Sequence, residues 1–401
     1  MRLKVVVVTS IFPIPTQPYR GHSVYENVLA LSKNMEVKVI CPFPRYPRWF
    51  KPRYDYRHPD LPCSPPGVEA CYFEYPALPG VTRCINGLVC ANRLEAYFRE
   101  YMPHLACNFW LYPDGYATVA AARKFGIPAV ICSIGSDLNR IADPASRWLT
   151  RLAMKRASFV VTKSEDLRDR AIRMGIHPGK VRTVRNGCDP AVFHLADRGA
   201  ARAELAVDDQ AELVLFVGRL DGKKGIFELL EAFASLARRR PNLQLVYVGD
   251  GIGGEHLRYK AKYLALEDRI SLVGSCSSHK VARWLAATNL LALPSYSEGQ
   301  PNVVIEALSC GRPVIATDVG GIPELVNETC GILVAPKDWR ALAEAIETGM
   351  ERSWDEHAIW NQFHRSWDEA AEELLGIFEQ AMRQRKEKWQ RPVKPTSVMS
   401  R

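Results

Sequence analysis

The sequence predicts an α/β protein with two domains, each built on a doubly wound parallel sheet. The chain has 401 residues, which is more than one ordinary domain core holds. In both halves, short β-branched runs alternate with longer amphipathic stretches. The runs are apolar throughout, which is typical of strands that helices cover on both faces, and strand–helix–strand order then gives parallel sheets.

The first half begins with a short apolar run that we interpret as a buried strand. Pro13, Pro15 and Pro18 follow it closely, and the run is too short for the apolar core of a secretory signal. The predicted strands of this half are residues 4–9, 36–40, 128–132 and 159–162. The predicted helices are residues 22–33, 118–125, 145–156 and 166–174.

The second half repeats the alternation more regularly. Its predicted strands are residues 213–217, 243–248, 270–272, 290–294 and 314–317. Its predicted helices are residues 225–239, 255–264, 279–286 and 302–310. Residues 186–209 are polar and irregular, and we expect them to form the hinge between the halves. Residues 367–385 carry an amphipathic pattern and predict a last helix.

These patterns place an N-terminal Rossmann-like domain at residues 1–198 and a C-terminal one at residues 199–360. A C-terminal helix is expected at about residues 361–385. The tail at residues 386–401 is basic and contains prolines, so we expect it to be disordered.

The charge of the chain is unevenly distributed. Residues 1–198 hold 28 lysines and arginines against 16 acidic residues, a net charge of +12, although the whole chain carries only +9. A basic half of this kind could face nucleic acid, an anionic membrane or an acidic substrate, and sign alone does not choose among them. The 11 cysteines form no Cys-x-x-Cys pair, so we expect buried thiols in a reducing cytoplasm instead of a disulfide framework or a zinc site. No run approaches about 18 apolar residues, so no membrane-spanning helix is expected.

The sharpest motif places two glutamates, Glu298 and Glu306, around the start of a predicted helix. It follows the predicted strand 290–294, and the helix begins at about Asn302. The N–H groups of the first turn and the positive end of the helix dipole form an anion site, for which phosphate is the natural occupant. The two carboxylates would accept hydrogen bonds from hydroxyls on either side of it. Taken alone, the acids could equally be a helix cap and a solvent-facing side chain.

A second motif places Arg219 and Lys224 in the loop between the predicted strand 213–217 and the next helix. Gly218 ends the strand. Both cations would lie at the carboxyl end of a parallel strand, where a doubly wound sheet binds its ligand, and the pair suits a diphosphate. Taken alone, a basic loop of this kind is more often a solvated turn.

Together these motifs resemble glycosyltransferase family 4, as do residues 311–324 (Gly-Arg-Pro-Val-Ile-Ala-Thr-Asp-Val-Gly-Gly-Ile-Pro-Glu) and the Asn-Gly-Cys-Asp…Phe run at 186–193. The resemblance covers about residues 1–380. It implies a GT-B fold, in which two Rossmann-like domains face each other across a cleft and the last helix packs back on the N-terminal domain. It also implies a retaining enzyme that uses a nucleotide-sugar donor, needs no cofactor and serves cell-surface polysaccharide biosynthesis.

The resemblance assigns a role to each matched residue of the C-terminal half. Arg219 and Lys224 would hold the donor diphosphate and neutralise the charge that develops on it, Glu306 would accept from the ribose hydroxyls, and Glu298 from a hydroxyl of the transferred sugar. Backbone near the sugar and phosphate oxygens would come from Gly218, Gly299, Gln300, Pro301, Asn302 and Val303. Fixed cations at the diphosphate lower the barrier directly, so no metal is expected, and no Asp-x-Asp motif occurs in the chain.

The N-terminal half matches the family less closely. Gly21 stands where the family has a Gly-rich loop, and Asp114 lies in a Tyr-Pro-Asp-Gly segment that resembles a loop beside the reacting sugar. Asp137 belongs to a Gly-Ser-Asp segment that resembles the family's His-Gly-x-Asp, but Ile134 occupies the histidine position. Asp114 and Asp137 are therefore the candidate catalytic residues of this half, or turn-forming residues of their loops.

Residues 44–57 interleave cations with aromatic side chains and prolines. This composition suits peripheral contact with an anionic membrane or a polyisoprenyl-linked acceptor, and also single-stranded nucleic acid. A solvated loop on the acceptor side is the simpler interpretation. With a saccharide or lipid-linked acceptor, the expected location is the cytoplasm, at the inner face of the membrane.

Three other functions compete with sugar transfer. Gly249 to Gly254 satisfies Gly-x-Gly-x-x-Gly, but no acidic residue ends the next strand as an NAD-dependent oxidoreductase requires. A nucleic-acid-binding protein explains the basic half but not the motifs of the other half, so we expect no nucleic acid. A GT-B relative without transfer activity, such as a nucleotide-sugar epimerase, a phosphorylase or a silent homologue, stays open because of Ile134.

Overall fold

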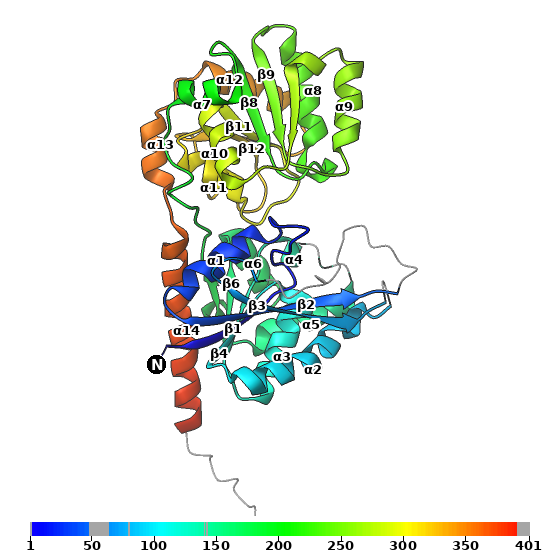
Figure 1. Ribbon diagram of the computed structural model, residues 1–401, viewed down its shortest axis with the longest axis vertical. Coiled ribbons are helices and arrows are strands. Elements are labelled where there is room, and N and C mark those ends of the chain that lie inside the picture. Colours follow the sequence, from blue (N-terminus) through cyan, green and yellow to red (C-terminus); the bar gives the residue numbers. More distant parts are fainter. Residues whose placement is uncertain (1, 48–63, 79–80, 140, 142, 391–401) are drawn as a thin grey trace, which may run out of the picture. The chain divides into compact units, whose positions relative to one another are not determined.

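The computed structural model describes residues 2–47, 64–78, 81–139, 141 and 143–390 (Figure 1). The chain divides into two compact units. Unit 1 contains residues 1–162, 168–184 and 371–401, and unit 2 contains residues 163–167 and 185–370. The domain boundary that the sequence suggests, after residue 198, therefore falls inside unit 2.

Unit 1 is built on a seven-stranded sheet in which every pair of neighbours is parallel. The strands are β1 (Lys4–Val8), β2 (Glu36–Arg45), β3 (Glu69–Pro76), β4 (Leu105–Phe109), β5 (Ala129–Cys132), β6 (Phe159–Thr162) and β7 (Val181–Thr183). Their spatial order is β3-β2-β1-β4-β5-β6-β7. Four consecutive valines, Val5 to Val8, are fully buried in β1, as expected of a central strand covered on both faces.

The helices of unit 1 follow its strands in the order of a doubly wound domain. They are α1 (His22–Ser32), α2 (Arg83–Tyr101), α3 (Tyr116–Lys124), α4 (Ser136–Asn139), α5 (Pro144–Arg156) and α6 (Glu165–Arg173), with a 3₁₀ turn η2 (Pro178–Lys180) before β7. The first residues of α6, up to Leu167, belong to unit 2. Asp143 caps α5 by accepting a hydrogen bond from the Ser146 amide at 2.7 Å, and Pro144 occupies the first helical position.

Unit 2 is built on a six-stranded parallel sheet with the order β10-β9-β8-β11-β12-β13. The strands are β8 (Glu212–Val217), β9 (Leu243–Val248), β10 (Ile270–Gly274), β11 (Leu290–Leu293), β12 (Val314–Thr317) and β13 (Gly331–Val334). The helices are α7 (Arg198–Leu205), α8 (Ile226–Ala237), α9 (Gly254–Tyr263), α10 (Ser278–Ala287), α11 (Asn302–Ser309), α12 (Trp339–Glu351) and α13 (Glu356–Phe363). These two parallel sheets confirm the predicted α/β class.

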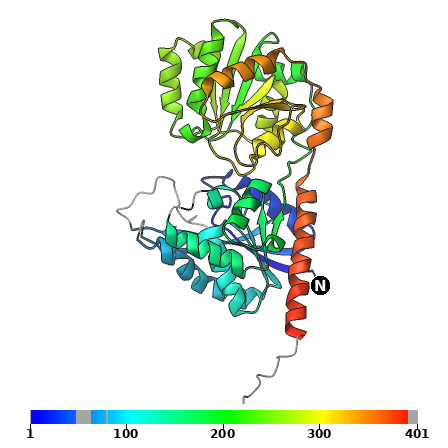
Figure 2. The same cartoon turned by 180° about the vertical axis from the view of Figure 1, so that it is seen from behind.

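The last helix, α14 (Trp367–Gln390), begins in unit 2 and continues as part of unit 1 from Ala371 onward. Figures 1 and 2 show it as a single long helix near the end of the chain. Leu374 and Phe378 on its apolar face are fully buried. The helix extends to Gln390, so residues 386–390 are helical where the sequence suggested a tail, and residues 391–401 lie outside the described part of the chain.

Two segments contain more regular structure than the sequence predicted. The hinge at residues 186–209 contains a helix, α7, which Asp197 caps by accepting from the Ala200 amide at 2.6 Å. Strand β2 continues to Arg45 through Pro42 and Pro44. It pairs with β1 only as far as Ile40 and beyond that only with β3, so the prolines lie where one side of the strand has no partner strand and needs no N–H.

Candidate active site

In unit 2, the predicted donor residues follow three adjacent strands. Arg219 and Lys224 come after β8, the segment from Glu298 to Asn302 comes after β11, and Gly320 comes after β12. Because β8, β11 and β12 are parallel neighbours, their carboxyl ends meet at one edge of the sheet. This is the edge at which open α/β sheets bind ligands.

Two glycines let these loops approach each other closely. Gly225 has a φ of +69°, and a Cβ on it would lie 2.0 Å from the Pro294 carbonyl oxygen. Gly320 has a φ of +58°, and a Cβ there would lie 2.0 Å from the carbonyl oxygen of Glu298. Both positions therefore require glycine for conformation and for space. The Tyr296 amide also donates to the Lys223 carbonyl at 3.0 Å, which joins the β8 and β11 loops.

An ion pair connects the two principal motifs. Lys224 Nζ lies 2.5 Å from Glu298 Oε1, and the side chains are only 25% and 11% exposed. A pair this enclosed is screened less by solvent than a surface pair and has a more defined geometry. The structure thus brings together a cation and a carboxylate that lie 74 residues apart in the sequence.

The start of α11 offers polar groups at the same edge. Pro301 precedes the helix and provides no side-chain cap for its first-turn amides. Gln300 accepts a hydrogen bond from the Asn186 amide at 2.6 Å, and Asn302 accepts from the Asn186 side chain at 2.8 Å. Within the described residues, Nε2 of Gln300 is buried and has no hydrogen-bond partner. A buried donor without a partner is costly, so a ligand oxygen at this position would be stabilising.

Glu306 lies one turn into α11. The residue keeps some exposure, but burial of its carboxyl raises its pKa to about 7. The carboxyl therefore titrates near neutral pH. Only its ionised form accepts hydrogen bonds with both oxygens.

The glycine run from 249 to 254 supports the Arg219 loop. Leu220 donates from its amide to the Asp250 carbonyl at 2.9 Å, and the Gly253 amide donates to the Leu220 carbonyl at 2.8 Å. These bonds hold the β9 loop against the β8 loop that carries Arg219. The run therefore has a structural use that its Gly-x-Gly-x-x-Gly spacing alone did not reveal.

In unit 1, the predicted residues also gather at the carboxyl edge of the sheet. Gly21 is the N-cap of α1, after β1, while Asp114 follows β4 and Asp137 follows β5. Strands β1, β4 and β5 are adjacent, so the three loops are neighbours. Asp114 is fully buried, and its Oδ2 accepts from the Ser10 amide at 2.5 Å. Its Oδ1 has no partner among the described residues.

Asp137 organises its loop through four hydrogen bonds. Oδ1 accepts from the Ser133 hydroxyl at 2.9 Å and from the amides of Ile134 and Gly135, and Oδ2 accepts from the Leu111 amide at 3.0 Å. Burial raises the pKa of Asp137, although these bonds oppose the rise. Because these four donors belong to the loops after β4 and β5, Asp137 is placed to hold the two loops together.

Two residues of this cluster were not singled out from the sequence. Ser10 supplies the amide that Asp114 binds, and Arg20 Nη2 donates to the Ser10 carbonyl at 2.8 Å. The Arg20 guanidinium also lies over the Phe43 ring, 5.1 Å from its centroid. The only sequence signal for Arg20 was its place directly before Gly21.

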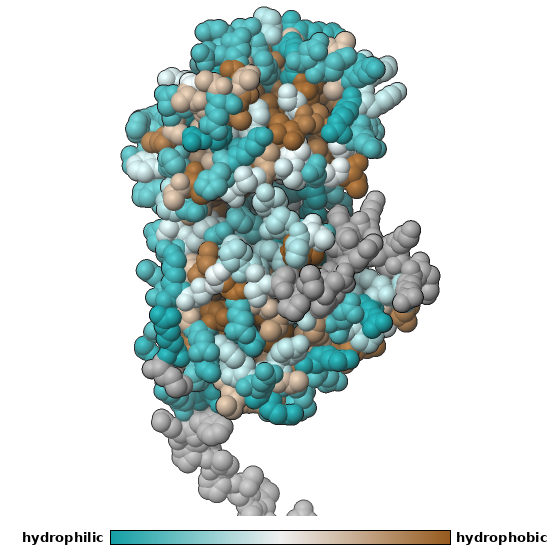
Figure 3. All heavy atoms as spheres, in the orientation of Figure 1, coloured by the Kyte–Doolittle hydropathy of each residue, from teal (hydrophilic) through white to brown (hydrophobic). Residues whose placement is uncertain are grey.

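Most of the 44–57 run lies outside the described residues. Of this run, only residues 44–47 are described, and Pro44 and Arg45 end β2. Within the described chain, no helix is both long enough and apolar enough to cross a membrane. Hydrophilic side chains cover much of the face drawn in Figure 3, with apolar ones in smaller areas.

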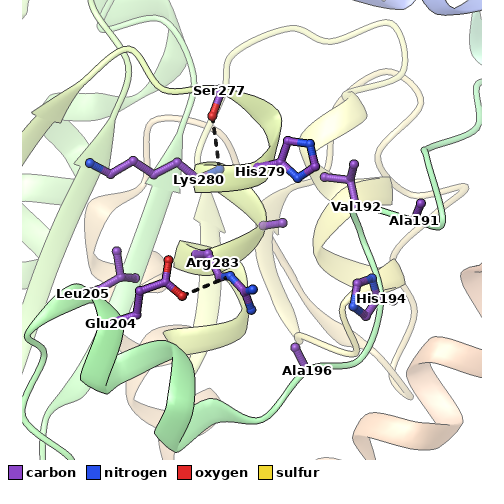
Figure 4. Close-up of a pocket in the computed structure, with 11 residues that line it drawn as sticks. Ala191, Val192, His194, Ala196, Glu204, Leu205, Ser277, His279, Lys280 and Arg283 are labelled. Carbon is purple, nitrogen blue, oxygen red and sulfur yellow. Dashed lines mark hydrogen bonds and ion pairs between the residues drawn. The ribbon is translucent and has the colours of Figure 1, made fainter.

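A separate hollow of about 590 Å³ lies elsewhere in unit 2 (Figure 4). It is bounded by the segment before α7, by the end of α7 and by α10. His194, His279 and Lys280 line it, and Glu204 pairs with Arg283 at 3.2 Å. None of the predicted site residues lines this hollow.

Asp114→Asn is expected to change how stability depends on pH. Burial raises the pKa of Asp114 from 3.8 to about 7, so the folded protein binds a proton here that the unfolded chain has lost. The bound proton on Asp114 therefore adds to the free energy of unfolding at acid pH, and this addition disappears as pH rises through about 7. Asparagine stays neutral, so the free energy of unfolding of the variant relative to the wild type should rise between pH 5 and pH 8, by about 2.7 kcal/mol.

The measurement is the melting temperature of both proteins by calorimetry across this pH range. Asp143→Asn is the control, because hydrogen bonding to the Ser146 amide lowers the pKa of Asp143 and keeps it ionised throughout. The difference in melting temperature between Asp143→Asn and the wild type should not vary with pH. Parallel curves for Asp114→Asn and the wild type would contradict the raised pKa.

Comparison with known proteins identifies two family models in the chain. One, described as glycosyl transferases group 1, matches residues 197–373, and the other, a glycosyl transferase 4-like domain, matches residues 21–187. TuaC of Bacillus subtilis (strain 168), whose name assigns it as a glycosyltransferase of teichuronic acid biosynthesis, is 31% identical over 356 residues. That match covers 86% of this chain and 88% of TuaC.

Solved structures share the fold over nearly the whole chain. Sucrose-phosphate synthase from Thermosynechococcus elongatus superposes with a TM-score of 0.72 at 22% identity, covering 97% of this chain and 98% of that one. Anabaena Alr3699/HepE in complex with UDP-glucose gives a TM-score of 0.68 at 19% identity, covering 96% and 100%. At such identities the likeness concerns the fold alone, and it confirms the predicted GT-B class.

Proposed function

Because this chain belongs to the group 1 glycosyl transferases, we propose that it moves a sugar from a nucleotide-diphosphate donor to a saccharide or lipid-linked acceptor. The proposed transfer retains the anomeric configuration and needs neither a metal ion nor a cofactor. The observation that carries the proposal is the enclosed ion pair of Lys224 and Glu298, at the sheet edge that also holds Arg219 and the start of α11.

The chemistry of the donor loops supports this assignment. When a glycosyl–phosphate bond breaks, the sugar becomes oxocarbenium-like and the diphosphate gains negative charge. Lys224 and Arg219 would stabilise that charge without reorganisation, which is the most effective form of electrostatic catalysis. Lys224 would then share its ammonium between the diphosphate and Glu298, and the carboxylate of Glu298 would orient a sugar hydroxyl.

The proton of the acceptor hydroxyl has a route that uses no side chain. In the proposed retaining step, the acceptor oxygen forms the new bond to the anomeric carbon while the bond to the phosphate oxygen breaks. The leaving phosphate oxygen takes the acceptor proton. Ile134 cannot transfer a proton, and the buried carboxyls of Asp114 and Asp137 bind loop amides. We therefore assign both aspartates a positioning role in the acceptor-side loops.

The place of the reaction is proposed from the relatives and the composition. The likeness to TuaC favours assembly of a cell-surface polysaccharide. A lipid-linked acceptor would place the enzyme in the cytoplasm at the membrane surface. The cationic and aromatic side chains of residues 44–57 are the proposed contact with that surface.

A panel of nucleotide sugars tests the proposed function. One of the UDP-, GDP- or ADP-sugars should raise the melting temperature, because a ligand that binds only the folded state stabilises it. At a concentration of about 100 Kd the gain is about 2.7 kcal/mol. The same donor should then support transfer to a saccharide acceptor with α-to-α or β-to-β stereochemistry, followed by NMR. No stabilisation by any member of the panel would overturn the proposal.

Metal chelation is expected to leave transfer unchanged. With Arg219 and Lys224 meeting the diphosphate charge, the rate with EDTA should stay within about twofold of the untreated rate. The assay compares untreated enzyme, EDTA-treated enzyme and EDTA-treated enzyme with excess Mg²⁺. Loss of transfer in EDTA followed by recovery in Mg²⁺ would show that a metal ion, and not Arg219 and Lys224, neutralises the diphosphate charge.

A further inference from the structure

A second pocket, in unit 1, lies at the edge of the sheet opposite to the predicted site. It has a volume of about 460 Å³. Its walls are the residues that precede β5, β6 and β7, together with the end of α14. Asp114 and Asp137 follow the carboxyl ends of β4 and β5, whereas this pocket opens at the amino ends. Strand β5 has four residues, so the two edges are separated by about 13 Å.

Five cationic side chains and no acidic side chain line this pocket. They come from four elements and are Arg123 of α3, Lys155 and Arg156 of α5, Lys180 of η2 and Arg385 of α14. Lys180 Nζ donates to the Lys155 carbonyl at 2.8 Å, which fixes it at the rim. Within the described residues, neither Arg156 nor Arg385 forms an ion pair with an acidic side chain.

This concentration of positive charge favours an anionic ligand. Like charges repel, so an anion in the hollow would relieve the repulsion among the five cations. Three of the five are arginines, whose planar forks bind phosphate oxygens in pairs. The volume lies within the range of pockets that hold small ligands, about 300–1,000 Å³.

We propose that this basic pocket binds a phosphate group, presented either by a small phosphorylated molecule or by a lipid headgroup. The site is distinct from the donor loops, since Arg219 and Lys224 belong to unit 2. The proposal is also independent of the proposed sugar transfer, because its test measures ligand binding and not turnover.

The test pairs two double variants of the full chain that remove the same charge from the same helices. Arg156→Gln/Arg385→Gln removes two cations of the pocket. Arg147→Gln/Arg383→Gln removes one cation each from α5 and α14 outside it. All four arginines are at least partly exposed, so both variants should fold, which circular dichroism and melting temperature verify.

The first measurement is titration calorimetry with inorganic pyrophosphate at low ionic strength. Affinity should fall at least about tenfold in the pocket variant and stay within about twofold in the control variant, because charge-assisted bonds to phosphate are lost only in the former. Binding at the donor loops contributes equally to all proteins, because Arg219 and Lys224 are unchanged.

The second measurement is co-sedimentation with vesicles of phosphatidylglycerol, compared with vesicles of phosphatidylcholine. If the pocket variant loses binding only to pyrophosphate, the ligand is a soluble phosphorylated molecule. If it loses binding only to phosphatidylglycerol vesicles, the ligand is a lipid headgroup. Either result supports the pocket as a phosphate site. Equal binding by the pocket variant and the control variant in both measurements would overturn it, as would no binding of the wild type to either probe.

Discussion

Replacing Lys224 with alanine is expected to lower kcat/KM for sugar transfer by about 10³-fold, because removing one preorganised donor to a developing charge costs about 10²–10³ in rate. The loss should appear mainly in kcat, since the diphosphate gains its charge in the transition state. The variant also removes the ammonium that lies 2.5 Å from Glu298 and helps to hold the carboxylate that orients the sugar. Steady-state kinetics at saturating acceptor measure the effect.

Lys223→Ala is the matched control, because Lys223 is the adjacent residue and is exposed to solvent. It removes the same charge from the same loop and should keep kcat/KM within about threefold of the wild type, as surface substitutions usually do. Equal losses in the two variants would mean that the loop acts only through its overall charge. Full activity of Lys224→Ala would refute the role given to this lysine.

Glu306→Gln is expected to weaken nucleotide binding about 10–100-fold at pH 8, because hydrogen bonds to a charged acceptor contribute about 1.5–3 kcal/mol. In the wild type, burial raises the pKa of Glu306 to about 7. Ribose hydroxyls donate to the ionised carboxylate, so binding favours loss of the proton. Affinity should therefore be constant above pH 7 and fall by up to about tenfold per pH unit below it.

Calorimetric titration of the nucleotide sugar, whose diphosphate stays fully ionised in this range, between pH 5.5 and pH 8 checks this second prediction. In the wild type, binding near pH 7 should release a proton, which the dependence of the heat on buffer ionisation reports. In Glu306→Gln, the affinity should not vary with pH over this range and no proton should be released. A wild-type affinity that does not change with pH would rule out a titrating carboxyl at the nucleotide.

The strands that the sequence located best are those with uniformly apolar runs. Residues 159–162, 243–248 and 314–317 match β6, β9 and β12 residue for residue. Three of the strands that the sequence did not locate, β3, β7 and β13, lie at sheet edges, where one neighbour is missing and an apolar run is not required. The fourth, β4, is central but contains Cys107 and Asn108 in place of β-branched residues.

The site shows a similar division between what the sequence reveals and what it does not. Motifs predicted the Arg219 and Lys224 loop and the Glu298 segment, because each lies at a strand end and forms a contiguous pattern. The bond of Ser10 to Asp114 joins loops 104 residues apart, and one of its partners is a backbone amide. Such a contact leaves no local pattern of residue types, so only the folded structure reveals it.

The route of α14 has a consequence for how the chain is made. Unit 1 contains residues 371–401, which follow the whole of residues 185–370. During synthesis, a ribosome therefore completes the second unit before it supplies the helix that finishes the first. Until then, the apolar surface of unit 1 that buries Leu374 and Phe378 stays exposed to solvent. A fragment that ends at residue 184 would keep that surface exposed permanently. Unit 1 is consequently complete only after the end of the chain has been made.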